Sequence, residues 1–351
     1  MESEYVMRGI MLCVFVALCS ITSQAQTDTA DSVKSDTIPH KESLLKRMDD
    51  KLSARYYHSK YDTNYVVRPK EKWLLRLMAN QAANYIHAKG TVNDVWSKYD
   101  LHTKRNTTFS FEVNYCDIAV SLSLNPAKIS GSSNRDYEFN FEYHGNWLSF
   151  NLNYQRTNSW TGDIDLKDIH HMEEDALNMK VFSLTAYYTF NHRRFSFPAA
   201  FYQNYRQLRS AGSWLAGLAF QSGCIRTTDE LKKRNPQAPE VHIDAAHVGI
   251  GGGYGYNLVL GKHSQWLLHL SILPTIVVYN HNELTVNDTQ LSAKHMRFNM
   301  IFNERAAVVY HFSPRYFVGT TFIMDNTVFD DKAVVVNQNR WFARAFVGVR
   351  L

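Results

Sequence analysis

Residues 136–155 read DYEFNFEYHGNWLSFNLNYQ and contain two strand-like halves. In each half apolar side chains alternate with polar or charged ones, which is the two-residue period of a β-strand with two different faces. Gly145-Asn146 supplies a tight turn between the halves. Aromatic residues stand at the ends of the apolar faces, as in strands whose outer faces meet the two interfaces of a membrane. This stretch predicts a membrane-crossing β-hairpin.

The same alternation recurs from residue 61 to the C-terminus. It covers 109–115, 118–124, 182–190, 214–220, 247–260, 266–278, 296–311, 316–324 and 341–351, and also Phe195, Phe197 and Ala199 after a turn at Asn191–Arg194. About thirteen candidate strands result, whereas bacterial single-chain barrels have even numbers. We therefore predict an all-β, antiparallel up-and-down transmembrane β-barrel of about 12 strands, within a range of roughly 10–14. Longer connections at 88–106, 157–177, 223–243 and 280–294 are expected as extracellular loops, with the short turns in the periplasm.

The N-terminus has the three parts of a secretory signal. Arg8 precedes an apolar run from Ile10 to Ile21, and a small-x-Ala pattern ends at Ala25. We predict a signal peptide over 1–25, a polar leader over 26–60 with a short N-terminal amphipathic helix between Lys41 and Tyr57, and the barrel over 61–351. Export and the barrel pattern together predict the cell outer membrane.

The last strand is apolar at every second position back from the C-terminal Leu351. Outer-membrane barrels usually finish in this way, although with Phe rather than Leu. The expected partners are therefore outer-membrane lipid and, through this strand, the barrel-assembly machinery. The formal charge of +5 is spread along the chain, which argues against a nucleic-acid partner. Cys116 and Cys224 are expected as free thiols, although one disulfide between them is also compatible with export.

Several charged residues share the parity of the inner faces. They are Glu138, Glu142, His144, Arg297, Arg305, Arg344 and Arg350. Charges inside a barrel must be paired or wet. Two interiors fit this set: a packed, salt-bridged core, in which Arg344 and Glu142 would bond across the lumen, or a polar channel with acidic and basic walls.

No stretch predicts a catalytic or cofactor site. The glycines between Gly249 and Gly255 lack the spacing and the following helix of a phosphate-binding loop, and fit a strand that allows close approach. His170–Asp175 contains metal-ligand types, but adjacent residues point apart, so a solvated loop is expected and no metal. His269 and Ser271 share one strand face without an assignable acid partner. We predict no enzyme and no cofactor.

Five short stretches resemble a known family. They are Tyr61–Val66, Leu122–Pro126, Tyr143–Asn146, Arg209–Leu218 and Gly253–Asn257. Their order is similar to that in the Bacteroidota outer-membrane barrel family catalogued as domain of unknown function 4421, over about residues 60 to 351. The resemblance implies an exported outer-membrane protein of that phylum and assigns no site residues.

Three functions are compatible with the sequence. The first expectation is a passive pore or small-solute channel. The alternative is a closed barrel that presents loops to partners, and the third is a lipid-modifying outer-membrane enzyme.

Overall fold

The computed structural model describes residues 50–51, 53–54, 60–92, 95–116, 118–129, 136–166, 169–236, 240–287, 289–291, 296–331 and 334–351. The chain divides into two compact units, Met1–Asp49 and Asp50–Leu351, and all described residues belong to the second. The predicted signal peptide and most of the leader thus lie outside the described residues. Asp50, Lys51, Ser53 and Ala54 are helical, within the stretch predicted as a short helix. Among the described residues, no helix is long and apolar enough to cross a membrane.

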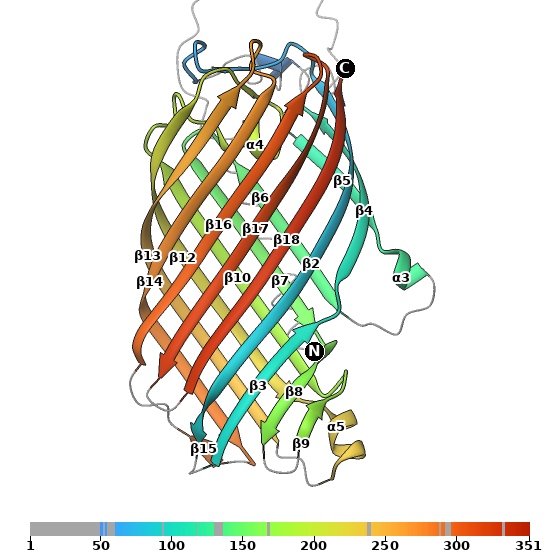
Figure 1. Ribbon diagram of the computed structural model, residues 1–351, viewed down its shortest axis with the longest axis vertical. Coiled ribbons are helices and arrows are strands. Elements are labelled where there is room, and N and C mark those ends of the chain that lie inside the picture. Colours follow the sequence, from blue (N-terminus) through green and yellow to red (C-terminus); the bar gives the residue numbers. More distant parts are fainter. Residues whose placement is uncertain are drawn as a thin grey trace, which may run out of the picture. The chain divides into compact units, whose positions relative to one another are not determined.

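The second unit is built on one curled sheet of 16 antiparallel strands (Figure 1). Twelve of these strands form one continuous path around the wall, and the other four, β3, β8, β9 and β15, lie outside that path. In spatial order the twelve are β5 (Ile118–Leu124), β4 (Asn106–Tyr115), β2 (Trp73–Val92), β18 (Val334–Arg350), β17 (Tyr316–Asp331), β16 (Met296–His311), β14 (Trp266–Val286), β13 (Val241–Leu260), β12 (Ala211–Thr227), β10 (Leu177–Thr189), β7 (Leu148–Thr157) and β6 (Tyr137–His144). The predicted fold class and strand number are confirmed.

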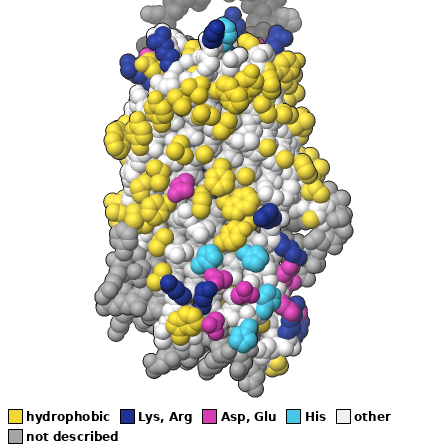
Figure 2. Space-filling model, in the orientation of Figure 1, with side chains coloured by type: hydrophobic (Ala, Val, Ile, Leu, Met, Phe, Trp, Pro, Cys, Tyr) yellow, Lys and Arg dark blue, Asp and Glu magenta, His cyan; other side chains and the backbone are white. Residues whose placement is uncertain are grey.

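The two ends of the barrel differ. The C-terminus and the short turns after β6, β13 and β16 lie at one end, which we call the turn end and which is uppermost in Figure 1. The opposite, loop end carries the longer connections. Between them the outward side chains are apolar, for example Leu270, Ile272 and Ile276 on β14, which are 68%, 43% and 53% exposed. Figure 2 shows hydrophobic side chains gathered in a broad belt below the turn end. An exposed apolar belt around a curled antiparallel sheet is typical of the outer surface of a membrane barrel.

Beyond the belt, the wall continues as a β-structured extension at the loop end. β2 pairs with β4 along Trp73–Ala82 and then with β3 (Val95–Thr103) along Tyr85–Val92. β3 pairs with β8 (Trp160–Leu166), and β8 with β9 (Ile169–Met172). The helix α5 (Asp229–Arg234) and the short β15 (Thr289–Leu291) complete this end.

The prediction of loops at 88–106, 157–177, 223–243 and 280–294 was wrong for most of these residues, which extend strands or form new ones. The physical reason is a second hydrophobic cluster in the extension. Leu101, Trp160, Ile164, Met179 and Val181 are buried together there, so the backbone around them is held as sheet. We call this part, β3, β8, β9 and the adjoining strand ends, the extension.

The two ends of the twelve-strand path do not pair among the described residues. β5 pairs only with β4, and β6 only with β7. Both faces of β5 are exposed, since Ser121 and Ser123 on one face and Val120 and Leu122 on the other all lie open. The helix α3 (Pro126–Ile129) follows β5. A seam therefore runs down the wall between β5 and β6.

The prediction of a strand through Phe195, Phe197 and Ala199 was wrong. After β10 the chain turns into the lumen and forms the short helix α4 (Phe197–Phe201), all of whose residues are buried. Ser196 caps this helix by accepting from the Ala199 N–H at 3.2 Å, and Pro198 lies in its first turn. The alternation of Phe195, Phe197 and Ala199 has the period of a strand. Ser196 and Pro198, however, are residues that favour the start of a helix, so the strand ends before them.

The segment then crosses the turn end. β11 (Arg206–Gln207) pairs with β1 (Val66–Val67) to form a separate two-stranded sheet. We call residues 195–207 the plug.

Candidate functional site

The lumen at the turn end is filled by the plug. Phe195, Phe197 and Phe201 are at most 2% exposed and belong to the largest hydrophobic cluster of the molecule. The strands contribute inward apolar residues to the same cluster, among them Leu267 on β14 and Phe317 on β17. Burial of these rings supplies the main stabilisation of the plug, since each fully buried large apolar side chain contributes about 1.5–3 kcal/mol.

Arg76 on β2 ties the wall to the plug. Its Nε and Nη2 atoms donate to the two carboxylate oxygens of Glu112 on β4 at 2.9 and 2.8 Å. Its Nη1 atom donates to the Phe201 carbonyl and to Gln203 Oε1, both at 2.8 Å. Arg76 is fully buried, and a buried guanidinium is stable only when a carboxylate and further acceptors surround it. The Phe201 carbonyl of the plug is thus one of the acceptors that stabilise the buried Arg76 guanidinium.

Two further wall residues hold the plug by its main chain. Arg350 on β18 donates to the Gln203 carbonyl from Nε at 3.1 Å and from Nη2 at 2.7 Å. Asn257 on β13 donates to the Ser196 carbonyl at 3.0 Å and to Gln207 Oε1 at 3.0 Å. The plug is therefore bonded to both sides of the wall. Arg350, predicted as a luminal charge, has its guanidinium on the plug.

Asn257 also completes a chain of hydrogen bonds through the two residues that the sequence placed on one strand face. Ser271 Oγ lies 3.0 Å from His269 Nε2, and His269 Nδ1 lies 2.7 Å from Asn257 Oδ1. This order is that of a nucleophile, a base and an orienting group. The third member is an amide and not an acid, and the strand register places Asn257 directly opposite His269.

The surroundings of this set are those of a packed core. Ser271 and His269 are 4% and 3% exposed, and the rings of Phe195, Phe197 and Phe201 lie 5.1–5.7 Å from the imidazole. A nucleophile needs room for a reacting carbon beside it. In this geometry the hydrogen bonds of His269 satisfy its ring nitrogens between the wall and the plug.

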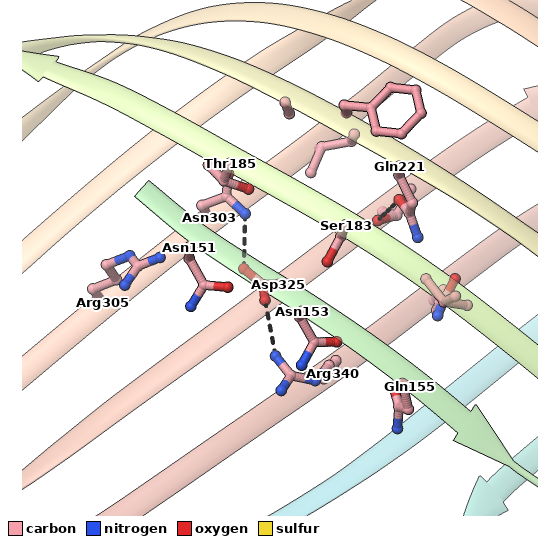
Figure 3. A pocket seen from close by; sticks show the side chains of 16 residues that line it. Asn151, Asn153, Gln155, Ser183, Thr185, Gln221, Asn303, Arg305, Asp325 and Arg340 are labelled. Carbon is pink, nitrogen blue, oxygen red and sulfur yellow. Dashed lines mark hydrogen bonds and ion pairs between the residues drawn. The ribbon is translucent and has the colours of Figure 1, made fainter. Parts of the chain in front are cut away.

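Toward the loop end the lumen is lined by amides, hydroxyls and charges (Figure 3). Asp325 on β17 accepts from Asn303 at 2.7 Å and pairs with Arg340 on β18 at 3.4 Å. Arg340 also contacts Glu138 on β6, which accepts from Asn153 at 3.0 Å. The space left between these side chains is about 40 Å³, which is room for a few water molecules and not for an organic solute, whose sites measure roughly 300–1,000 Å³.

The other predicted luminal residues lie around this network. His144 Nδ1 is 3.0 Å from the Tyr187 hydroxyl, and Arg305 lies over the Tyr187 ring at 5.4 Å. Glu142 accepts from Asn140 at 2.8 Å and from Asn151 at 3.3 Å. Arg344 donates to Asn80 at 3.0 Å and not to Glu142, so the expected bond between these two residues across the lumen is not the one formed. The side chain of Arg297 lies outside the described residues.

Sequence reasoning missed four luminal charges: Arg340, Asp325, Arg76 and Glu112. Arg340 has the same parity as Arg344 and Arg350, so the alternation of the last strand contained the signal. Arg76 lies in a stretch that was not assigned to a strand, and its pairing with Glu112 follows from the register of β2 with β4.

The glycine-rich stretch forms the middle of β13, as expected for a strand with close approach. A Cβ atom on Gly255 would lie 2.9 Å from the Phe195 ring of the plug, and one on Gly253 would lie 2.1 Å from the Ile272 carbonyl oxygen. Glycine at 255 thus makes room for the plug.

The remaining predictions concern thiols and metals. Cys116 and Cys224 are free thiols, which resolves the alternative left open for them. His171 lies on β9, and among the described residues no three His, Cys, Asp or Glu side chains converge in a way that could hold a metal ion.

Comparison with known proteins identifies the family of this chain. A family described as domain of unknown function (DUF4421) matches residues 60–351. A search of curated proteins finds no match.

Three solved structures are similar in fold. The outer-membrane protease OmpT of Escherichia coli is 7% identical with a TM-score of 0.38, covering 81% of this chain and 97% of that one. The translocator domain of the autotransporter NalP of Neisseria meningitidis is 9% identical with a TM-score of 0.27, covering 88% and 95%. The toluene transporter TodX of P. putida is 7% identical with a TM-score of 0.24, covering 81% and 91%. These likenesses concern the fold alone.

Proposed function

Since the chain belongs to the DUF4421 family, whose description states no role, we propose its function from the geometry: a closed, non-conducting barrel of the bacterial outer membrane that displays the extension to a partner outside the cell. The observation that carries the proposal is the plug, which fills the lumen at the turn end with buried aromatic rings and is bonded to the wall by Arg76, Arg350 and Asn257. A solute would have to displace it. Membership of the Bacteroidota, assembly through the C-terminal strand and the outer membrane as location are part of the same proposal.

The extension supports a display role because it exceeds what a membrane requires. A transmembrane strand needs about 9–11 residues, whereas β13 and β14 have 20 and 21. The last seven residues of β14 at the loop end, 280–286, would rise about 18 Å at a tilt of roughly 40°. With short turns in the periplasm, as in other bacterial barrels, the extension stands outside the cell.

The surface of the extension carries charged pairs. His87 lies 2.6 Å from Asp100, and the Lys98 ammonium lies 2.6 Å from the same carboxylate. On β13, His242 lies 2.6 Å from Asp244. Figure 2 shows His, Asp and Glu side chains gathered at the loop end below the apolar belt. Charged pairs on strands backed by a hydrophobic cluster give a fixed pattern that a partner protein or glycan recognises by complementary polar contacts.

A second candidate is the small-solute channel, with the plug as its gate. The polar lining around Asp325, Arg340 and Asn303 favours it. A purely structural barrel could be filled by a packed apolar core and would not need such a lining.

Conductance in planar bilayers separates the two candidates. For a closed barrel we expect no channel steps from the wild-type protein, and none from a variant with the plug contacts cut, Arg76→Ala with Arg350→Ala. Steps from that variant alone would favour the gated channel, and ohmic steps from the wild type would overturn the proposal. Arg226→Ala, an exposed arginine of β12, is the matched control.

Orientation is tested on intact cells. In a Cys224→Ser background, a cysteine at His281 of the extension should react with a membrane-impermeant maleimide, whereas one at His263 of the turn end should react only after permeabilisation. The reverse pattern would contradict the display role. Heat-modifiable migration from urea-washed outer membranes tests the location itself.

A further inference from the structure

The turn end contains a second, larger hollow that the plug and two turns form together. It has a volume of about 810 Å³, within the range of small-ligand sites. Its lining comes from the start of the described barrel unit, from β11 and its neighbours, and from the turns after β13 and β16. It includes Arg206, Arg209, His263, Ser264, His311 and Ser313, and none of its lining residues is acidic. We call it the turn-end pocket.

Two arginines of this pocket have no carboxylate partner among the described residues. Arg206 Nη2 donates to the carbonyl oxygens of His263 and Ser264, which orients the side chain without neutralising it. The Arg206 Nε atom is buried and makes no hydrogen bond within that part of the chain. Arg209 is exposed, and its guanidinium lies 6.0 Å from the Tyr65 ring. By contrast, the neighbouring Arg194 lies 3.7 Å from Asp62.

His311 adds an independent observation. Its side chain lines the pocket and is 2% exposed, yet neither ring nitrogen has a hydrogen-bond partner in the described structure. Buried polar side-chain atoms are mostly hydrogen-bonded, and leaving one unpaired costs about 1–3 kcal/mol. A buried donor beside two uncompensated guanidinium groups has the chemistry of a site for an oxyanion.

We propose that the turn-end pocket binds a phosphate group. A guanidinium presents a fork of N–H donors that matches phosphate oxygens, and hydrogen bonds between two ions are about twice as strong as neutral ones. His311 and Ser313 supply neutral donors for the remaining oxygens, whereas the Ser264 hydroxyl donates to the Leu208 carbonyl at 2.8 Å. Phe312, which is 63% exposed, borders the pocket on the side of the apolar belt. The phosphate belongs either to a phospholipid headgroup of the adjoining leaflet or to a free phosphate-bearing solute.

The experiment measures binding to the purified full-length protein in nonionic detergent. Inorganic phosphate is titrated by calorimetry, and short-chain phosphatidylglycerol is titrated beside diacylglycerol, which lacks the phosphate. We expect saturable binding of phosphate or phosphatidylglycerol and none of diacylglycerol. Binding of both phosphate ligands indicates a free solute, and binding of phosphatidylglycerol alone indicates the lipid.

Substitutions connect the binding to the pocket. Arg206→Gln and Arg209→Gln should each weaken it about tenfold or more, because a hydrogen bond to a charged group contributes about 1.5–3 kcal/mol and 1.4 kcal/mol is tenfold. Arg206→Lys, which keeps the charge without the fork, should bind between wild type and Arg206→Gln. Arg226→Gln is the matched control, and heat-modifiability verifies folding of each variant. Absence of saturable binding in the wild type, or binding equal in all variants, would overturn the proposal.

Discussion

Removal of Arg76 is expected to destabilise the barrel more than any exposed arginine could. In Arg76→Ala, Glu112, which is 7% exposed in the wild type, has no cation beside it, and the Phe201 carbonyl and Gln203 Oε1 lose their donor. Breaking a buried ion pair from one side costs about 3–5 kcal/mol. We therefore expect the free energy of unfolding to fall by about that amount.

A double variant separates the charge from the packing. Arg76→Met with Glu112→Gln removes both charges together, so only the plug acceptors are left unpaired, at about 1–3 kcal/mol each. Arg76→Ala leaves the same two plug acceptors unpaired and, in addition, the buried Glu112 carboxylate, so the double variant should be the more stable of the two.

Urea unfolding in lipid vesicles, followed by gel mobility of the folded form and by tryptophan fluorescence, measures both differences. Arg226→Ala, at an exposed position, should shift stability by no more than about 0.5 kcal/mol. If Arg76→Ala lost less than about 1 kcal/mol, or if the double variant were no more stable than the single one, the ion pair would not hold the plug as argued.

Three further outcomes follow from the geometry. Backbone amides of β5 and β6 that face the seam should exchange with deuterium much faster than those of β13 in a nanodisc; equal protection would mean that the two edges pair in the membrane. A fluorophosphonate probe should leave Ser271 unlabelled in the folded protein because the plug covers it, and labelling lost in Ser271→Ala would instead indicate an enzyme. The hydrogen bond from His87, and then that from Lys98, lowers the pKa of Asp100 below its ordinary 3.8, so the small stability difference between wild type and Asp100→Asn should be fully present at pH 7 and shrink as the pH falls below 3.8 through the lowered pKa; a difference that did not change on acidification would contradict this assignment.

The barrel could be predicted from the sequence because the alternation of each membrane strand is visible within that strand alone. Lipid on one side and an enclosed interior on the other impose alternation on each strand separately, so stretches such as Tyr137–His144 and Leu148–Thr157 could be assigned without their neighbours. The inward parity of Glu138, Arg305, Arg344 and Arg350 followed from the same rule.

The plug, the seam and the pairing of luminal charges were decided only by the tertiary structure. Phe195 and Phe197 alternate like strand residues, and only the space inside the barrel determines that they turn inward and bury against the wall. Likewise, Arg76 meets Glu112 and Asn257 meets His269 through the register of adjacent strands, which joins residues distant in the chain. Periodicity specifies which face of the strand a side chain occupies. Its partner on that face depends on the register between adjacent strands.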